Sequence, residues 1–236
     1  MGVDALALLR DEPGRAAILL DIDGTLAPIV SRPEDATVPE ETREVLRGLV
    51  QRYALVGAIT GRPGPHGREM VSVAGVRVVG NHGLELAGDA DGWRDRLGTF
   101  RDSVDWPVED KGLALSYHYR THPDQDAARA ELERVAARAR DEGFRARFGR
   151  MVLEVLPPLD VDKGTAVRAL LEQSGLARAL FAGDDTTDLD AFRAIEELEV
   201  GVKVAVGSAE GPRELRGRAD IVVEGPAGLV ELLRTL

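Results

Sequence analysis

The chain has 236 residues, and at roughly 150 residues per domain this length predicts one or two domains. Apolar residues make up 44% of the chain and charged residues 30%, which is typical of a soluble globular protein, and there is no cysteine for disulfides, thiolate metal sites or nucleophilic catalysis. The net charge of −11 argues against general binding to nucleic acid or anionic membranes, because both need a positive surface.

No segment reads as a membrane span or a secretory signal. The longest apolar stretches are far shorter than the roughly 18 residues that a bilayer crossing needs. The first residues include Asp4 and Asp11 and lack a basic start. We therefore expect a cytoplasmic protein without membrane or nucleic-acid partners, acting as a monomer.

The first part of the chain alternates strands with a helix. Residues 16–20 form a short, fully apolar run that stops at Asp21, which predicts a buried strand. Residues 39–52 have helical apolar spacing, with glutamates in the first turn where the helix dipole favours them. Residues 54–59 and 76–79 are further expected strands. This order is typical of a parallel sheet.

The middle of the chain has a different pattern. We expect a strand over residues 113–119, a long helix over 123–140, and strands near 144–148 and 151–156. These elements predict a small α+β unit over residues 88–157, inserted into the parallel sheet.

The alternation of strands and helices returns after the insert. The expected helices cover residues 163–174, 187–198 and 228–236, and the expected strands cover residues 179–182, 203–206 and 221–223. We therefore predict an α/β fold, with a doubly wound parallel-sheet core over residues 1–87 and 158–236. An inserted α+β cap domain over residues 88–157 interrupts this core.

Acidic residues gather where apolar strands end. Asp21 and Asp23 follow the first strand, and Asp184 begins a second acidic group after the strand at residues 179–182. Ligands of open parallel sheets bind at the carboxyl ends of the strands, so we expect these groups to converge with Thr60 and Lys163. Crowded carboxylates repel each other unless a cation lies among them, and Mg²⁺ prefers oxygen ligands. The pattern predicts a magnesium site.

Four motifs, each after a strand or at a helix start, resemble the haloacid dehalogenase-like phosphohydrolase superfamily. In chain order they are Asp21–Leu26, Thr60, Lys163 and Gly183–Asp188. Two similar acidic runs, at residues 89–92 and 160–164, follow no buried strand, and we expect their acids in turns or on the surface.

The flanking residues resemble trehalose-6-phosphate phosphatases over nearly the whole chain. They are Arg32–Ala36, Thr60–Arg62, Gly80–Glu85, Lys111 with His118–Arg120, and Glu154–Pro157. Thr60 stands where serine is commoner in that family, and it keeps the hydroxyl. The resemblance implies Mg²⁺-dependent hydrolysis of the sugar phosphate trehalose 6-phosphate to trehalose and phosphate.

The resemblance also implies catalytic roles for core residues. Asp21 would be the nucleophile that forms an aspartyl-phosphate. Asp23 would protonate the leaving sugar oxygen and later activate water. Thr60 and Lys163 would hold the phosphoryl oxygens, and Lys163 would also offset negative charge.

The metal site follows from the same resemblance. The Asp21 and Asp184 carboxylates and the backbone carbonyl of Asp23 would bind Mg²⁺. Asp185 or Asp188 would act through the waters of the metal or its surroundings.

Several polar residues are candidates for substrate binding, although each has an ordinary structural alternative. Next to the core motifs they are Gly61, Arg62, Asn81 and His82, and Arg62 would equally bind the acids of its own loop. In the insert they are Lys111, His118, Arg120 and Glu154, whose side chains suit sugar hydroxyls. His66 and His122 are expected in turns, and Trp93 and Trp106 are expected in cap packing.

Three other functions stay open at this level. Another capped sugar phosphatase, acting on sucrose phosphate, mannosyl-phosphoglycerate or a hexose phosphate, would share the core motifs. A catalytically inactive partner-binding domain would have no reason to keep Asp21, Asp23, Thr60, Lys163 and Asp184 together. A phosphoacceptor signalling domain is disfavoured by Asp23 and by the cap-sized insert.

Overall fold

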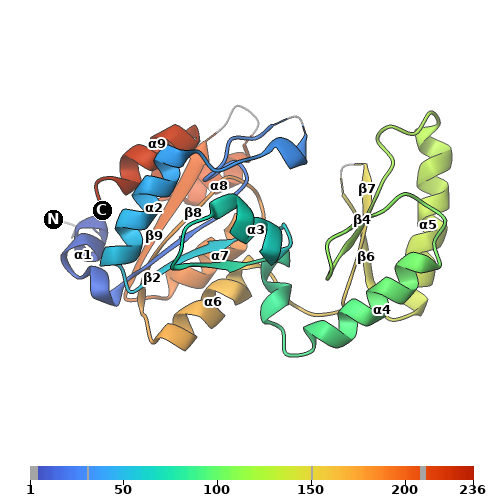
Figure 1. Ribbon diagram of the computed structural model, residues 1–236, viewed down its shortest axis with the longest axis horizontal. Helices are drawn as coiled ribbons and strands as arrows, with labels where there is room; N and C mark the ends of the chain where they lie inside the picture. Colours follow the sequence, from blue (N-terminus) through green and yellow to red (C-terminus); the bar gives the residue numbers. More distant parts are fainter. Residues whose placement is uncertain (1–4, 31, 150, 208–210) are drawn as a thin grey trace. The chain divides into compact units, whose positions relative to one another are not determined.

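The computed structural model describes residues 5–30, 32–149, 151–207 and 211–236 (Figure 1). The chain forms two compact units. One consists of the chain up to Gly83 together with Val161–Leu236, and the other is Leu84–Asp160.

The first unit is built on a six-stranded parallel sheet in the order β10-β9-β8-β1-β2-β3. The strands are β1 (Ala17–Leu20), β2 (Leu55–Ile59), β3 (Val76–Val79), β8 (Arg178–Gly183), β9 (Val200–Gly207) and β10 (Ile221–Glu224). Strand β1 lies between β2 and β8, with Leu20 paired to Ala58 and to Ala182. The carboxyl ends of these three strands are therefore neighbours.

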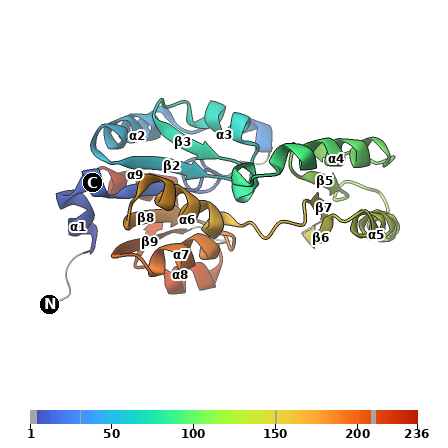
Figure 2. The ribbon, with the colours of Figure 1, turned by 90° about the horizontal axis from the view of Figure 1, so that it is seen from below.

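Helices cover both faces of this sheet, which explains the uninterrupted apolar run of β1 (Figures 1 and 2). Ile18 and Leu20 pack in one core cluster with residues of α1 (Ala5–Asp11), α2 (Glu40–Arg52) and α9 (Gly225–Leu233). On the other face are α6 (Lys163–Ser174) and α7 (Asp188–Glu196), whose Phe192 contacts Phe181 of β8. The expected doubly wound parallel sheet is confirmed.

The second unit has an antiparallel sheet in the order β4-β5-β7-β6. Its elements are β4 (Glu109–Asp110), β5 (Leu115–His118), β6 (Arg145–Gly149), β7 (Val152–Leu156), α4 (Ala90–Asp102) and α5 (Gln125–Asp141). One face of the sheet packs on both helices, with Tyr117 and Leu153 buried against Phe100 and Leu132. Trp93 and Trp106 pack against this cluster, as expected. The unit is the predicted kind of α+β structure.

The structure contains four α-helices that were not predicted from the sequence. They are α1, α3 (Gly64–Val71), α4 and α8 (Arg213–Arg218). Glycines weaken helical propensity, and they obscure the apolar spacing of α3 and α4. The acids of residues 89–92 were expected in turns or on the surface; Asp91 is indeed exposed, although it lies in the first turn of α4. His66 was also expected in a turn, and it lies in α3.

Among the described residues, no helix is both long enough and apolar enough to cross a bilayer.

Candidate active site

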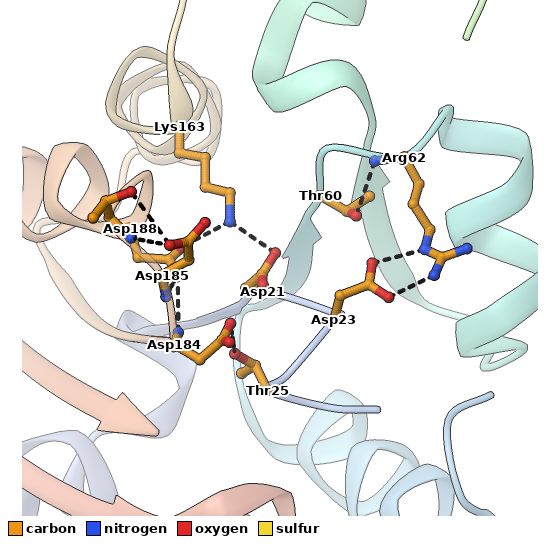
Figure 3. Close-up of polar contacts among 10 residues, drawn as sticks. Asp21, Asp23, Thr25, Thr60, Arg62, Lys163, Asp184, Asp185 and Asp188 are labelled. Carbon is orange, nitrogen blue, oxygen red and sulfur yellow. Dashed lines mark hydrogen bonds and ion pairs between the residues drawn. The ribbon is translucent and has the colours of Figure 1, made fainter. Parts of the chain in front are cut away.

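The acidic residues of the core unit meet where β1, β2 and β8 end (Figure 3). Asp21 directly follows β1, and its backbone N–H donates to Ala182 of β8 at 2.9 Å. Asp184 directly follows β8, and Thr60 directly follows β2. The order of the strands therefore brings these side chains together, as the sequence predicted from strand ends.

A buried lysine joins two of the aspartates. The Lys163 Nζ atom lies 2.8 Å from Asp21 Oδ1 and 2.6 Å from Asp188 Oδ1, and all three side chains are almost fully buried. Lys163 is the first residue of α6, whose start is fixed by a capping box between Asp162 and Thr165. The helix start thus holds the ammonium group in a defined place.

Three buried carboxylates form a cluster at this point. Asp21, Asp184 and Asp188 each offer an oxygen, and these oxygens lie within 4.8 Å of one another. Asp188 Oδ2 accepts hydrogen bonds from the backbone N–H groups of Asp184 and Asp185, both at 2.9 Å. Asp188 is therefore oriented toward the cluster by the loop after β8, whereas Asp185 is exposed.

Glycine makes room for this cluster. Gly24 has a φ of +79°, and a Cβ atom there would lie 2.0 Å from Asp184 Oδ2. Gly183 is similar in effect, because a Cβ atom would lie 2.2 Å from Asp188 Cγ. Larger residues at either position would push a carboxylate out of place.

Burial and neighbouring charges shift the pKa values of the residues in this cluster. Burial raises the pKa of Asp21 well above its usual value, and the charge of Asp188 adds to this, although Lys163 acts in the opposite direction. Burial and then the charge of Asp188 raise the pKa of Asp184 to about 6. Burial would lower the pKa of Lys163, but the attraction of Asp188 and Asp21 outweighs it and raises the pKa.

This donor set fits a divalent cation. Three carboxylates face one ammonium group, which leaves uncompensated negative charge when all three are ionised. A hard cation bound by oxygen atoms would remove this repulsion.

A second ion pair lies beside the cluster. Arg62 donates to both oxygens of Asp23, from Nε at 2.7 Å and from Nη2 at 2.6 Å (Figure 3). The backbone N–H of Arg62 also donates to Thr60 Oγ1 at 3.2 Å. The structure therefore places Arg62 on an acid of the neighbouring loop, whereas the two alternatives that the sequence left open were the substrate and the acids of its own loop.

The loop after β3 packs against these residues. Asn81 and His82 have left-handed backbone angles, with φ values of 51° and 52°. The backbone N–H of Asn81 donates to the Arg62 carbonyl, and that of His82 donates to the Thr60 carbonyl. A Cβ atom on Gly61 would lie 2.6 Å from His82 Nε2, so the imidazole ring lies directly against this glycine. The core candidates thus form one connected group.

The candidates of the second unit gather on its sheet, on the face opposite the helices. His118 Nε2 lies 2.9 Å from Glu109 Oε2, and Lys111 Nζ lies 3.6 Å from the same oxygen. On β7, Glu154 accepts from Arg147 Nε at 2.8 Å. Arg120 is exposed beyond the end of β5.

Glu109 was missed in the sequence. Its strand has only two residues, too few for a recognisable alternation. Its register opposite Ser116 is what assigns it to this face.

A family model described as trehalose-phosphatase matches residues 19–106 and 105–219 of the chain. The chain belongs to the trehalose-phosphatase family. The resemblance drawn from the motifs is thereby confirmed, and the haloacid dehalogenase-like fold with it.

Members of this family and their structural neighbours cover the chain almost completely. A probable trehalose-phosphate phosphatase of Sinorhizobium fredii is 31% identical over 242 residues, covering 92% of this chain and 91% of the relative. A crystal structure of a trehalose-6-phosphate phosphatase related protein has a TM-score of 0.71 and 26% identity, covering 93% of this chain and 96% of that one.

Other similar proteins are much longer. An uncharacterized glycosyl hydrolase of Mycobacterium tuberculosis is 34% identical over 216 residues, which are 80% of this chain. The match spans 16% of the length of that relative.

Proposed function

We propose that this protein is a phosphatase that hydrolyses trehalose 6-phosphate to trehalose and inorganic phosphate. The observation that carries the proposal is the buried cluster of Asp21, Asp184 and Asp188 around Lys163, in a chain of the trehalose-phosphatase family. Phosphoryl transfer requires a nucleophilic carboxylate, a fixed positive side chain such as the Lys163 ammonium group, and a binding site for a metal cation.

The reaction has two steps. In the first, an Asp21 oxygen bonds to phosphorus while the bond from phosphorus to the sugar oxygen breaks, and Asp23 gives its proton to that oxygen. In the second, Asp23 takes a proton from water as the water oxygen attacks phosphorus and releases Asp21. Lys163 and Thr60 hold the phosphoryl oxygens during both steps.

Mg²⁺ would be held by the carboxylates of Asp21 and Asp184 together with the backbone carbonyl of Asp23. Asp188, which points toward the same cluster, would orient the waters of the metal or coordinate it directly. When bound, Mg²⁺ supplies charge neutralisation for the carboxylates and for the phosphoryl group. The glycine at position 24 supports this assignment, because it leaves space that the Asp184 carboxylate occupies.

The unit Leu84–Asp160 would act as the cap that binds the sugar. Its sheet presents Glu109, Lys111, His118 and Glu154, and carboxylates and cations of this kind recognise sugar hydroxyls. Both carboxylates are already paired with cations, which orients them for hydroxyl donors. Arg120 would be a further sugar contact of this unit. In the core unit, Gly61, Asn81 and His82 would be substrate contacts.

Phosphate release from a panel of sugar phosphates, with Mg²⁺ or with excess chelator, tests this function. We expect hydrolysis of trehalose 6-phosphate, little hydrolysis of sucrose 6-phosphate, mannosyl-phosphoglycerate and hexose phosphates, and none under chelation. A preference for another sugar phosphate would keep the chemistry and replace the substrate. Cytoplasmic location and a monomeric state stay predictions from the sequence, and size-exclusion chromatography with light scattering tests the second.

A further inference from the structure

The side chain of Arg62 contacts Asp23, the general acid and base of the proposed reaction. Its Nε and Nη2 atoms reach the two Asp23 oxygens at 2.7 and 2.6 Å, and Nη1 lies 3.4 Å from His66 Nε2. All three guanidinium nitrogens therefore contact protein groups. The Arg62 side chain is only 13% exposed, whereas that of Asp23 is 40% exposed. The arginine is thus the more fixed partner.

This contact restricts the carboxylate of Asp23 to one orientation. A planar guanidinium that donates to both oxygens fixes the plane of the carboxyl group, whereas a single ammonium would allow it to rotate. The Arg62 backbone is itself fixed, since its N–H donates to Thr60 and its carbonyl accepts from Asn81. His66 of α3 contacts the third guanidinium nitrogen, with Nε2 as acceptor because arginine has only donors.

We infer that Arg62 is a positioning residue that aims the Asp23 carboxylate, with His66 as its support, and is not a ligand of the substrate phosphate. This inference rests on the proposed function, because it assumes that Asp23 protonates the leaving sugar oxygen and activates water. It assigns Arg62 a role different from substrate binding. Its consequence is that the loss of Arg62 affects proton transfer rather than phosphate binding.

Substrates whose leaving groups differ in acidity distinguish a role of Arg62 in positioning Asp23 from a role in binding phosphate. A sugar alkoxide needs a proton as it leaves, whereas the dinitrophenolate of dinitrophenyl phosphate leaves without one. Arg62→Ala and Arg62→Lys should therefore lower kcat for trehalose 6-phosphate by about 30-fold or more, a part of what general acid–base catalysis contributes. The pre-steady-state burst of dinitrophenolate should stay within about threefold of wild type.

A double-mutant cycle gives a second readout. In an Asp23→Asn background, where the aimed group no longer carries a proton to transfer, Arg62→Ala should cause less than about a twofold further loss. Arg68→Ala, an exposed arginine of α3, is the matched control and should leave kcat unchanged. Thermal melting of each variant checks that the fold is kept, and Arg62→Lys serves if the alanine variant does not fold.

The experiment distinguishes a failure of the inference about Arg62 from a failure of the proposed function. An equal loss of the dinitrophenolate burst, with weaker inhibition by inorganic phosphate, would show that Arg62 binds the phosphoryl group and would overturn the inference. A full additional loss in the Asp23→Asn background would overturn it as well. Wild-type protein that releases no phosphate from trehalose 6-phosphate would instead refute the proposed function.

Discussion

A Cβ atom on Gly24 would lie 2.0 Å from Asp184 Oδ2, so the absence of a side chain at Gly24 is what admits the Asp184 carboxylate. Gly24→Ala should move that carboxylate and also strain a backbone with a φ of +79°. We expect the free energy of unfolding to fall by about 1–3 kcal/mol. Titration calorimetry should show at least about a tenfold loss of Mg²⁺ affinity, as for other losses of metal-site support.

Gly217→Ala is the matched control for this variant, because nothing lies within 4 Å of a Cβ atom there. It lies in α8, so alanine should leave stability equal or raise it by up to about 1 kcal/mol. If Gly24→Ala bound Mg²⁺ with the same affinity as the wild type, this result would contradict the proposed role of Asp184 as a metal ligand.

The raised pKa of Asp184 predicts how the chelated protein responds to pH. Its folded value of about 6 lies above the unfolded value of about 4, so ionisation of Asp184 costs stability as pH rises between them. In chelator at pH 7 to 8, Asp184→Asn should be more stable than wild type by roughly 1–3 kcal/mol. Urea unfolding at several pH values should show this difference closing toward pH 4.

Added Mg²⁺ should reverse that order, because the asparagine variant has lost a charged ligand while wild type gains stability from binding. A stability difference that does not change with pH would contradict the assigned cause.

The position of Lys163 between Asp21 and Asp188 predicts a large effect of its removal. Lys163→Met leaves buried carboxylates without their cation, which should cost about 3–5 kcal/mol in urea unfolding at pH 7 and abolish phosphate release. The cost should shrink as the pH falls, because burial raises the pKa of Asp21 and its carboxylate takes up a proton. Lys203→Met is the control, because the partners of Lys203 are exposed acids and its loss should cost at most about 1 kcal/mol.

Glu154 tests the role of the second unit. Glu154→Ala should lower kcat/KM for trehalose 6-phosphate about 10-fold or more, since an unpaired sugar hydroxyl costs roughly 1–3 kcal/mol. Hydrolysis of dinitrophenyl phosphate, which lacks the sugar, should change little. Glu133→Ala, on the exposed side of α5, should affect neither substrate. Equal losses on both substrates would mean that Glu154 serves folding instead.

The parallel sheet could be predicted because its strands are short apolar runs, and three of them, β1, β2 and β8, are each followed directly by a polar residue of the proposed site. Asp21 ends a run that is apolar throughout, which two covered faces require. The place of Asp188 beside Asp21 follows from the neighbouring positions of β1 and β8, so the sequence indicated the cluster as well.

Contacts between distant loops could not be predicted in the same way. The pairing of Arg62 with Asp23 joins residues 39 positions apart, and no local spacing distinguishes it from a contact with substrate. Helix α3 escaped prediction because its glycines are unfavourable in helices; Gly67 is there because its backbone lies close to Val78 and Thr60. Tertiary packing, rather than propensity, forms this helix.

The rate of phosphate release from trehalose 6-phosphate by wild type and by Asp21→Asn, both in Mg²⁺, tests the central claim most directly. An amide oxygen is a poor nucleophile, so the variant should show no turnover while its circular dichroism spectrum and melting cooperativity match those of wild type. Appreciable phosphate release by the well-folded variant would contradict an aspartyl-phosphate mechanism at Asp21.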